Sequence, residues 1–177
     1  VKTGEFGEVF PQIKEWTTKP LKFAHAGDVL ICVVGATIGK LNIGIDCAIG
    51  RSVAAIRPSV DILRSKYLFY MLHPYTLKLR RQSRGSAQGV IGKAELATVN
   101  LRLPSLGEQD RIVAKVDELM ALCDELEAKH LDAADAHEKL VSHLLGTLAN
   151  SENAGDFAAN WQRIAAHFDA LFTTETS

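Results

Sequence analysis

The sequence predicts an α+β protein in which a small β-rich domain is followed by one long α-helix. A nearly continuous apolar run at 28–34, bounded by Gly27 and Gly35, is typical of a strand buried on both faces. A heptad repeat begins after residue 105 and continues for more than four repeats. Residues 1–105 hold 15 Lys and Arg against 7 Asp and Glu, whereas residues 106–177 hold 5 against 14. The chain therefore divides into a basic domain of net charge +8 and an acidic helical part of net charge −9.

Further strands of the basic domain are expected where apolar residues recur between glycines. The segments 37–45 and 52–58 are strand candidates, and the glycines between them mark turns or bulges. Val99 to Leu103 is expected to form a final strand of the sheet. The sequence thus predicts a small sheet around the buried strand at 28–34.

Two helices are expected between these strands. The stretch 64–73 is predicted to be a helix that Pro74 stops, because proline disfavours the helical conformation of the residue before it. A second short helix is expected at 75–83, leading into a Gly- and Ser-rich loop at 84–89.

The long helix is predicted from its start signal and its period. Ser105 and Glu108 have the S-x-x-E spacing of a capping box. A helix over 106–149 would be about 66 Å long at about 1.5 Å per residue, too long for the small domain to cover. It is therefore expected to pair with a partner helix in an antiparallel coiled coil. The expected interface, here called the seam, steps by four and three residues: Ile112, Val116, Leu119, Cys123, Leu126, His130, Ala133, His137, Leu140 and Leu144.

The middle of the seam is polar and small, at His130, Ala133 and His137. The favoured interpretation is a close-packed or register-setting stretch of an antiparallel pair. The alternative is a metal or pH-sensitive site where paired His130 residues meet at a two-fold axis.

A short amphipathic helix is expected after the long one, over 157–172, following a polar break at 150–155. Its apolar face is more typical of a docking surface than of a cofactor site and comprises Trp161, Ile164, Ala165, Phe168 and Phe172.

Composition argues against several classes of protein. The longest apolar run, Val29 to Val34, is too short to span a bilayer. The three cysteines are odd in number and widely spaced, which predicts reduced thiols in the cytoplasm and no metal site. The run VGATIGKL is one residue short of a phosphate-binding loop and has Leu41 where that loop needs a hydroxyl. No residue is nominated as a nucleophile or base, so we expect neither catalysis nor a cofactor.

Basic and amide side chains cluster around the 84–89 loop. Lysine and arginine there can neutralise phosphates, while arginine and glutamine can make bidentate contacts to guanine and adenine edges. The alternative is a solvated basic helix end. The candidate DNA contacts are Lys78, Arg80, Arg81, Arg84, Ser86 and Gln88, with Lys40, Arg51 and Ser52 at strand ends beside glycines as weaker candidates.

Five segments then occur in order and with natural spacing: GDVLICVVGATIGK (27–40), CAIGRSVAAIRP (47–58), YLFYML (67–72), RGSAQGVI (84–91) and LRLPSLGEQDRIVAKVDELMALCDELEAK (101–129). Together they closely resemble the specificity subunit of type I restriction–modification enzymes. The resemblance implies a target recognition domain that reads one half of a split site in double-stranded DNA, and a conserved helix that spaces two such domains. It also implies a subunit without catalysis of its own, which assembles with modification (methyltransferase) and restriction subunits.

The chain departs from the family pattern in its organisation. Complete subunits carry two recognition domains and two conserved helices, whereas this chain has one of each. We expect a recognition domain at 1–104 that is truncated at its N-terminus, a coiled-coil helix at 105–149, and a linker with a short helix at 150–177. The unpaired seam predicts a two-fold homodimer that reproduces the two halves of a whole subunit.

Two other functions remain open at the level of sequence. The chain could be the DNA-recognition tail of a fused restriction–methyltransferase polypeptide, which catalytic motifs upstream of Val1 would reveal. It could also be a protein-interaction scaffold without a role on DNA, which salt-insensitive binding or no binding to duplex DNA would favour.

Overall fold

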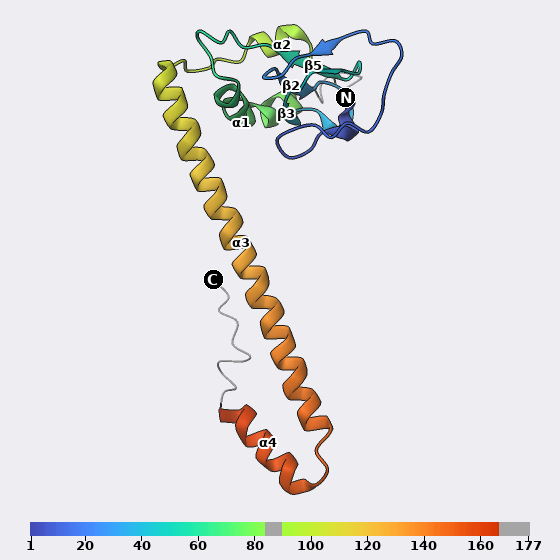
Figure 1. The fold of residues 1–177 in the computed structure, drawn as a ribbon, viewed down its shortest axis with the longest axis vertical. Helices are drawn as coiled ribbons and strands as arrows, with labels where there is room; N and C mark the ends of the chain where they lie inside the picture. Colours follow the sequence, from blue (N-terminus) through green and yellow to red (C-terminus); the bar gives the residue numbers. More distant parts are fainter. Residues whose placement is uncertain (84–89, 167–177) are drawn as a thin grey trace. The chain divides into compact units, whose positions relative to one another are not determined.

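The computed structural model describes residues 1–83 and 90–166. Its contacts divide the chain into two compact units, Val1–Asp117 and Glu118–Ser177, and the division falls inside the long helix α3 (Leu106–Ala149). The first unit holds all the described strands, which are drawn in blue and cyan in Figure 1. Among the described residues, no helix combines the length and the apolar character of a membrane span.

A three-stranded antiparallel sheet forms the centre of the first unit. Its order is β3 (Leu41–Ile43), β2 (Val29–Cys32) and β5 (Val53–Ile56). Every residue of β2 is 0% exposed, which confirms a strand buried on both faces. The flanking strands are shorter than the predicted segments 37–45 and 52–58, and a 3-10 turn, η2 (Gly35–Thr37), overlaps the start of the first segment.

The two faces of β2 pack against different layers. Val29 and Ile31 join a core with Leu68, Phe69, Leu72 and Leu79 of helix α1 (Ser65–Ser83). On the other face, Leu30 packs with Ala24, Ile49 and Val53, beside a second antiparallel pair, β1 (Phe23–Ala24) and β4 (Cys47–Ala48). Each fully buried aliphatic side chain of this kind contributes about 1.5–3 kcal/mol.

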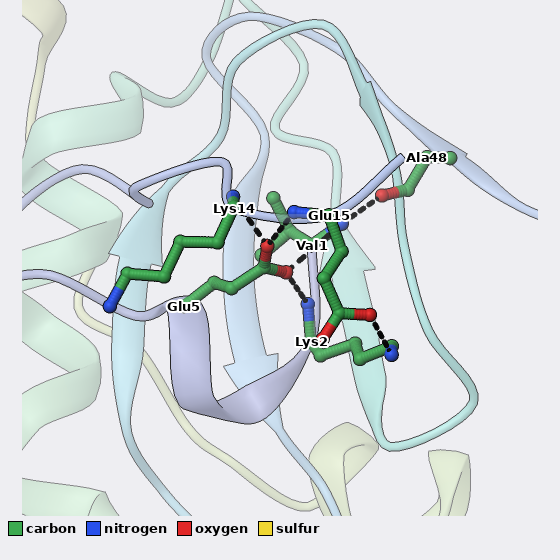
Figure 2. Close-up of polar contacts among 6 residues, drawn as sticks. All are labelled: Val1, Lys2, Glu5, Lys14, Glu15 and Ala48. Carbon is green, nitrogen blue, oxygen red and sulfur yellow. Dashed lines mark hydrogen bonds and ion pairs between the residues drawn. The ribbon is translucent and has the colours of Figure 1, made fainter. Parts of the chain in front are cut away.

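The buried carboxylate of Glu5 holds the N-terminal segment together. Glu5, in η1 (Thr3–Glu5), accepts hydrogen bonds from the backbone N–H groups of Lys2 (2.6 Å), Lys14 (2.6 Å) and Glu15 (2.9 Å) (Figure 2). Burial opposes its ionisation, but these N–H groups hold the pKa of Glu5 below its usual range. Asn42, also fully buried, binds both backbone groups of Gly7 and fixes the segment to β3.

Helix α1 corrects the prediction that Pro74 stops a helix and that a second one follows. Ser65–Ser83 is one helix with Pro74 inside it. Pro74 lacks the N–H that would bond to the preceding turn, which weakens the helix locally. Leu72 and Leu79, on either side of Pro74, are both buried in the core, and this packing compensates for the lost backbone bond.

The predicted strand at Val99–Leu103 is wrong, because this segment has no ladder partner among the described residues and is irregular. The hydroxyl of Tyr67 donates to Arg102 O (2.8 Å), and the hydroxyl of Tyr75 donates to Asn100 O. Both tyrosines belong to α1, so side chains supply the donors that a neighbouring strand would have supplied. The segment follows α2 (Lys93–Ala97), a short helix that the sequence analysis did not predict.

Helix α3 starts as predicted. Ser105 precedes it, and its Oγ accepts a hydrogen bond from Glu108 N (3.4 Å), as expected of an N-cap. The Glu108 carboxylate pairs with Arg111 (2.7 Å) one turn further along the helix.

In the second unit, α4 (Ala154–Ala166) begins three residues before the predicted start at 157, because Asn153 caps it by accepting from Asp156 N (2.9 Å). Ile164 on its apolar face is buried, whereas Trp161 is half-exposed and Ala165 exposed. Phe168 and Phe172 lie outside the described residues. Of the described residues of this face, only Ile164 is therefore buried; Figure 1 shows α4 following the end of α3.

Asp28 anchors the start of β2 through an ion pair between its buried carboxylate and the exposed Arg57 side chain. Its carboxylate is 2% exposed and accepts from Arg57 Nε (2.8 Å) and Arg57 Nη2 (2.9 Å), and from His25 N (2.8 Å). Chiefly through the Arg57 hydrogen bonds, and against the effect of burial, the pKa of Asp28 lies below its usual range. Asp28 therefore stabilises the fold above the ordinary carboxyl pKa, and this stabilisation is lost as the pH falls through its lower folded value.

Replacing Asp28 with Asn is expected to lower the free energy of unfolding by about 2 kcal/mol at neutral pH, because charge-assisted hydrogen bonds to a buried carboxylate are lost. The variant should also lose part of its pH dependence below about pH 5. Urea unfolding across this pH range measures both effects. Asp61→Asn, at an exposed carboxylate, is the control, and equal pH dependence of the two variants would contradict the role given to Asp28.

Candidate nucleic-acid interface

One end of the three-stranded sheet collects residues from three separate parts of the sequence. The end of β2 lies beside the starts of β3 and β5, because Cys32 N donates to Lys40 O (2.9 Å) and Val33 N donates to Ser52 O (2.9 Å). The antiparallel register therefore brings Lys40, Arg51 and Ser52 to this same end, which we call the basic end of the sheet. Lys40 and Arg51 are exposed and Ser52 is half-buried.

The second half of α1 packs against the basic end. Gly39 has φ +83°, and a Cβ at this position would lie 3.0 Å from Thr76 Cβ, so glycine allows the helix to approach closely. Arg80 is half-buried and its Nε donates to Ile38 O (2.9 Å), which gives this arginine a structural contact. Lys78 and Arg81 on the same helix are exposed. The predicted cations of α1 thus join those of the strand starts.

Arg84, Ser86 and Gln88 lie outside the described residues, but the residues that flank them are described. Ser83 ends α1, and Val90 forms an antiparallel bridge with Val34. Ile91 N donates to Val33 O (2.8 Å), and the Ile91 side chain is buried in the core. Val90 and Ile91, which follow 84–89, are therefore tied to the basic end of the sheet.

The cations of this end differ from three others of the first unit, which form ion pairs. Arg57, Arg64 and Lys66 pair with carboxylates at 2.8, 3.1 and 2.7 Å. Among the described residues, no carboxylate forms an ion pair with Lys40, Arg51, Lys78 or Arg81. The sequence holds no Asp or Glu between Asp61 and Glu95. Positive charge therefore accumulates at the basic end, where it can meet a polyanion.

A groove of about 790 Å³ borders the basic end and was not predicted from the sequence. Arg51 and Ser52 line it, together with Trp16, Lys19 and Lys22. Trp16 is 91% exposed. The signal that was available is the alternation of aromatic residues and lysines in 14–23, a composition often found at nucleic-acid surfaces.

The seam of α3 has two environments. Ile112 and Val116 are half-buried, and they belong to the first unit. In the second unit, Leu144 is half-buried and the intervening positions are exposed, among them Leu119 (50%), Leu126 (57%) and Leu140 (45%). The exposed seam positions are Leu119, Cys123, Leu126, His130, Ala133, His137 and Leu140. In the described part of the chain, no three His, Cys, Asp or Glu side chains gather as metal ligands, around His130 or elsewhere.

Comparison with known proteins gives the relatives of the chain. The specificity subunit of the type I restriction enzyme EcoAI of Escherichia coli is 37% identical over 94% of this chain and 30% of its own length. The EcoEI specificity subunit of Escherichia coli is 53% identical over 68% of the chain and 21% of its own length. A solved structure on complex assembly and conformational transition of the type I R-M system contains a chain with a TM-score of 0.69 and 32% identity, over 79% of this chain and 35% of that one.

The chain thus spans about a third or less of the length of these proteins. The family model for the type I restriction modification DNA specificity domain matches residues 12–135, which include the whole sheet, α1 and the first part of α3. The chain therefore belongs to the family of type I restriction modification DNA specificity domains.

Proposed function

We propose that this chain is a non-catalytic DNA-recognition subunit whose first part, residues 1–104, reads one half of a split site. The observation that carries the proposal is the basic end of the sheet. Lys40, Arg51, Lys78 and Arg81 come from three segments, have no carboxylate partner among the described residues, and adjoin the residues that flank 84–89. Family membership supports the same function, since these relatives are named specificity subunits.

The chemistry of the two kinds of residue assigns them different tasks. Lys40, Lys78 and Arg81 suit phosphate contacts, which provide affinity through counterion release without sequence information. Arg84 and Gln88 suit bidentate contacts with base edges in the major groove, which provide the sequence preference. Arg80, which already binds Ile38 O, positions the helix end instead.

We further propose that the chain acts as a two-fold homodimer through the helix at 105–149. Leu119, Leu126 and Leu140 are each about half-exposed in the isolated chain. A partner helix in antiparallel orientation would bury them and place two recognition domains at opposite ends of the pair. His130 and His137 would then lie within the pair, as polar residues that set its register.

Catalysis would come from partner proteins, the modification (methyltransferase) and restriction subunits, and the helical parts at 105–149 and 150–177 would take part in assembly. Cys32, Cys47 and Cys123 form no disulfide, which fits a reducing compartment and therefore a cytoplasmic complex.

Binding to duplex DNA at different salt concentrations tests the proposal. The affinity is expected to fall steeply between about 50 and 200 mM salt. Lys78→Ala should weaken binding to all sequences and reduce the salt slope by about 1, whereas Arg84→Ala with Gln88→Ala should relax or abolish the sequence preference.

Lys129→Ala is the matched control, since Lys129 lies on α3 and pairs with Glu125 at 2.7 Å. It should leave both quantities unchanged. An affinity that is insensitive to salt, or the absence of binding, would favour a scaffold without a role on DNA. A sequence preference that survives the double change would show that Arg84 and Gln88 do not read the bases.

A further inference from the structure

The start of α3 is fixed to the first unit by a buried amide. Gln109 is 0% exposed, and its Oε1 accepts from Arg64 N (2.8 Å). Its Nε2 donates to Ile62 O (2.8 Å) and Pro104 O (2.9 Å). The neighbouring Asp110 pairs with the Arg64 guanidinium at 3.1 Å. Gln109 therefore ties the first turn of α3 to the loop that precedes α1.

A second attachment lies further along the same helix. Asp117 Oδ2 accepts from Lys66 Nζ (2.7 Å), and Asp117 Oδ1 accepts from the hydroxyl of Tyr70. The hydrogen bonds from Lys66 and then Tyr70 hold the pKa of Asp117 below its usual range. Burial, with the Asp117 carboxylate, raises the pKa of Tyr70 to about 12, so the hydroxyl remains a donor at neutral pH. Both partners of Asp117 belong to α1.

A helix that is attached at two points along its length has a defined direction, whereas attachment at one point fixes only its position. Gln109 and Asp117 are eight residues apart, about 12 Å along the helix axis at about 1.5 Å per residue. Ile112 and Val116 between them are half-buried, and the contact at Asp117 adds a hydrogen-bonded attachment at the far end of this stretch. Lys66 and Asp117 are 41% and 38% exposed, so their pair adds little to stability. The pair joins α3 to α1, so its geometry bears on the orientation of the helix.

We propose that Asp117, with Lys66 and Tyr70, forms a positioning joint that sets the direction in which α3 leaves the recognition domain, and thereby selects the spacing between the two half-sites. This inference rests on the proposed function. Each base pair added between two half-sites rotates one against the other by about 34° and separates them by about 3.4 Å. A joint that holds α3 in one direction can match only one spacing, whereas a loose joint tolerates several.

The test compares Asp117→Asn with Glu125→Gln in the full chain. Both changes neutralise one carboxylate of α3 that pairs with a lysine, but Glu125 pairs with Lys129 of the same helix. Duplexes carry the same inverted half-sites with zero, one or two base pairs added to or removed from the preferred spacer. We expect the unmodified chain and Glu125→Gln to favour one spacer by about tenfold, and Asp117→Asn to bind all of them within about threefold.

The Asp117→Asn variant must keep its preference for the half-site sequence while it loses the preference for one spacer. An unfolded variant would lose both. Unchanged spacer selectivity in Asp117→Asn would overturn the joint. If the unmodified chain binds no DNA, the proposed function fails, and the joint is tested by the distance between spin labels at Ser59→Cys and Ala114→Cys, with Cys47 and Cys123 replaced by Ser. A narrow distribution that broadens in Asp117→Asn supports the joint, and equal widths contradict it.

Discussion

Replacing Gln109 with Leu is expected to lower the free energy of unfolding by about 3–5 kcal/mol, a large fraction of the stability of a domain of this size. Leucine matches the volume of glutamine but makes none of its hydrogen bonds. The change leaves Arg64 N, Ile62 O and Pro104 O without their partner in a site closed to water. Urea unfolding followed by circular dichroism measures the loss.

Gln162→Leu provides the matched control, since Gln162 is exposed on α4. It should change stability by less than about 0.5 kcal/mol. Gln109→Glu separates hydrogen bonding from volume. It keeps an acceptor for Arg64 N but lacks the amide donors to Ile62 and Pro104, and its destabilisation should grow as the pH rises and the carboxyl ionises. A loss below about 1 kcal/mol for Gln109→Leu would show that the buried amide does not hold the start of α3.

Replacing Leu126 with Asp is expected to convert a dimer into a monomer at micromolar concentration. Leu126 lies on the seam and is 57% exposed in the isolated chain. In a two-fold pair, the change would bury two carboxylates without partners, a cost of several kcal/mol. Sedimentation equilibrium measures the mass of each species directly.

Leu131→Asp is the control for the position of the seam. Leu131 is a leucine on the same helix, is 68% exposed, and lies outside the seam. It should leave the dimer intact. A monomeric mass for the unmodified chain would count against pairing. Dissociation by Leu131→Asp with no effect of Leu126→Asp would show that another face of α3 forms the interface.

The sequence was sufficient for features that depend on local pattern. The run at 28–34 contains only apolar residues after Asp28, and it forms the strand that packs on both faces. The start of α3 was predictable because Ser105 is a strong N-cap that follows Pro104. Membership of the specificity-subunit family was also recognised from the sequence, because five segments kept their order and spacing.

Features that depend on tertiary contacts were missed or wrong. Pro74 lies inside α1, since the burial of Leu72 and Leu79 outweighs the local preference. The segment after α2 is irregular, since hydroxyls of α1 bind its carbonyls. Nothing in the residues themselves marks Tyr67 and Tyr75 as those donors.

The heptad pattern has a similar limit. It assigns Ile112 and Val116 to the same seam as Leu126, because period alone does not distinguish contacts within a chain from contacts between chains. In the structure, Ile112 and Val116 are half-buried, and they lie between Gln109 and Asp117 along the helix. The part of the seam that is open to a partner is therefore centred further along α3.

The candidate DNA residues were found by composition, but their convergence was not. Lys40 and Arg51 were weaker candidates, placed at strand ends beside glycines. The antiparallel pairing of β3 and β5 with β2 brings them to the end of the sheet where α1 and Val90 also lie. Arg80 was predicted together with its neighbours, and the structure adds a contact within the fold, the hydrogen bond from Arg80 Nε to Ile38 O.

Selection of bound duplexes from a randomised pool tests directly whether two recognition domains read DNA as a two-fold pair. The purified chain is mixed with duplexes that carry a long random segment, and the duplexes that it retains are sequenced. A two-fold pair of recognition domains predicts enrichment of one short motif that occurs twice, in inverted orientation, at a fixed spacing. Enrichment of a single motif without an inverted copy would contradict the pair, and the absence of any enriched motif would contradict sequence recognition itself.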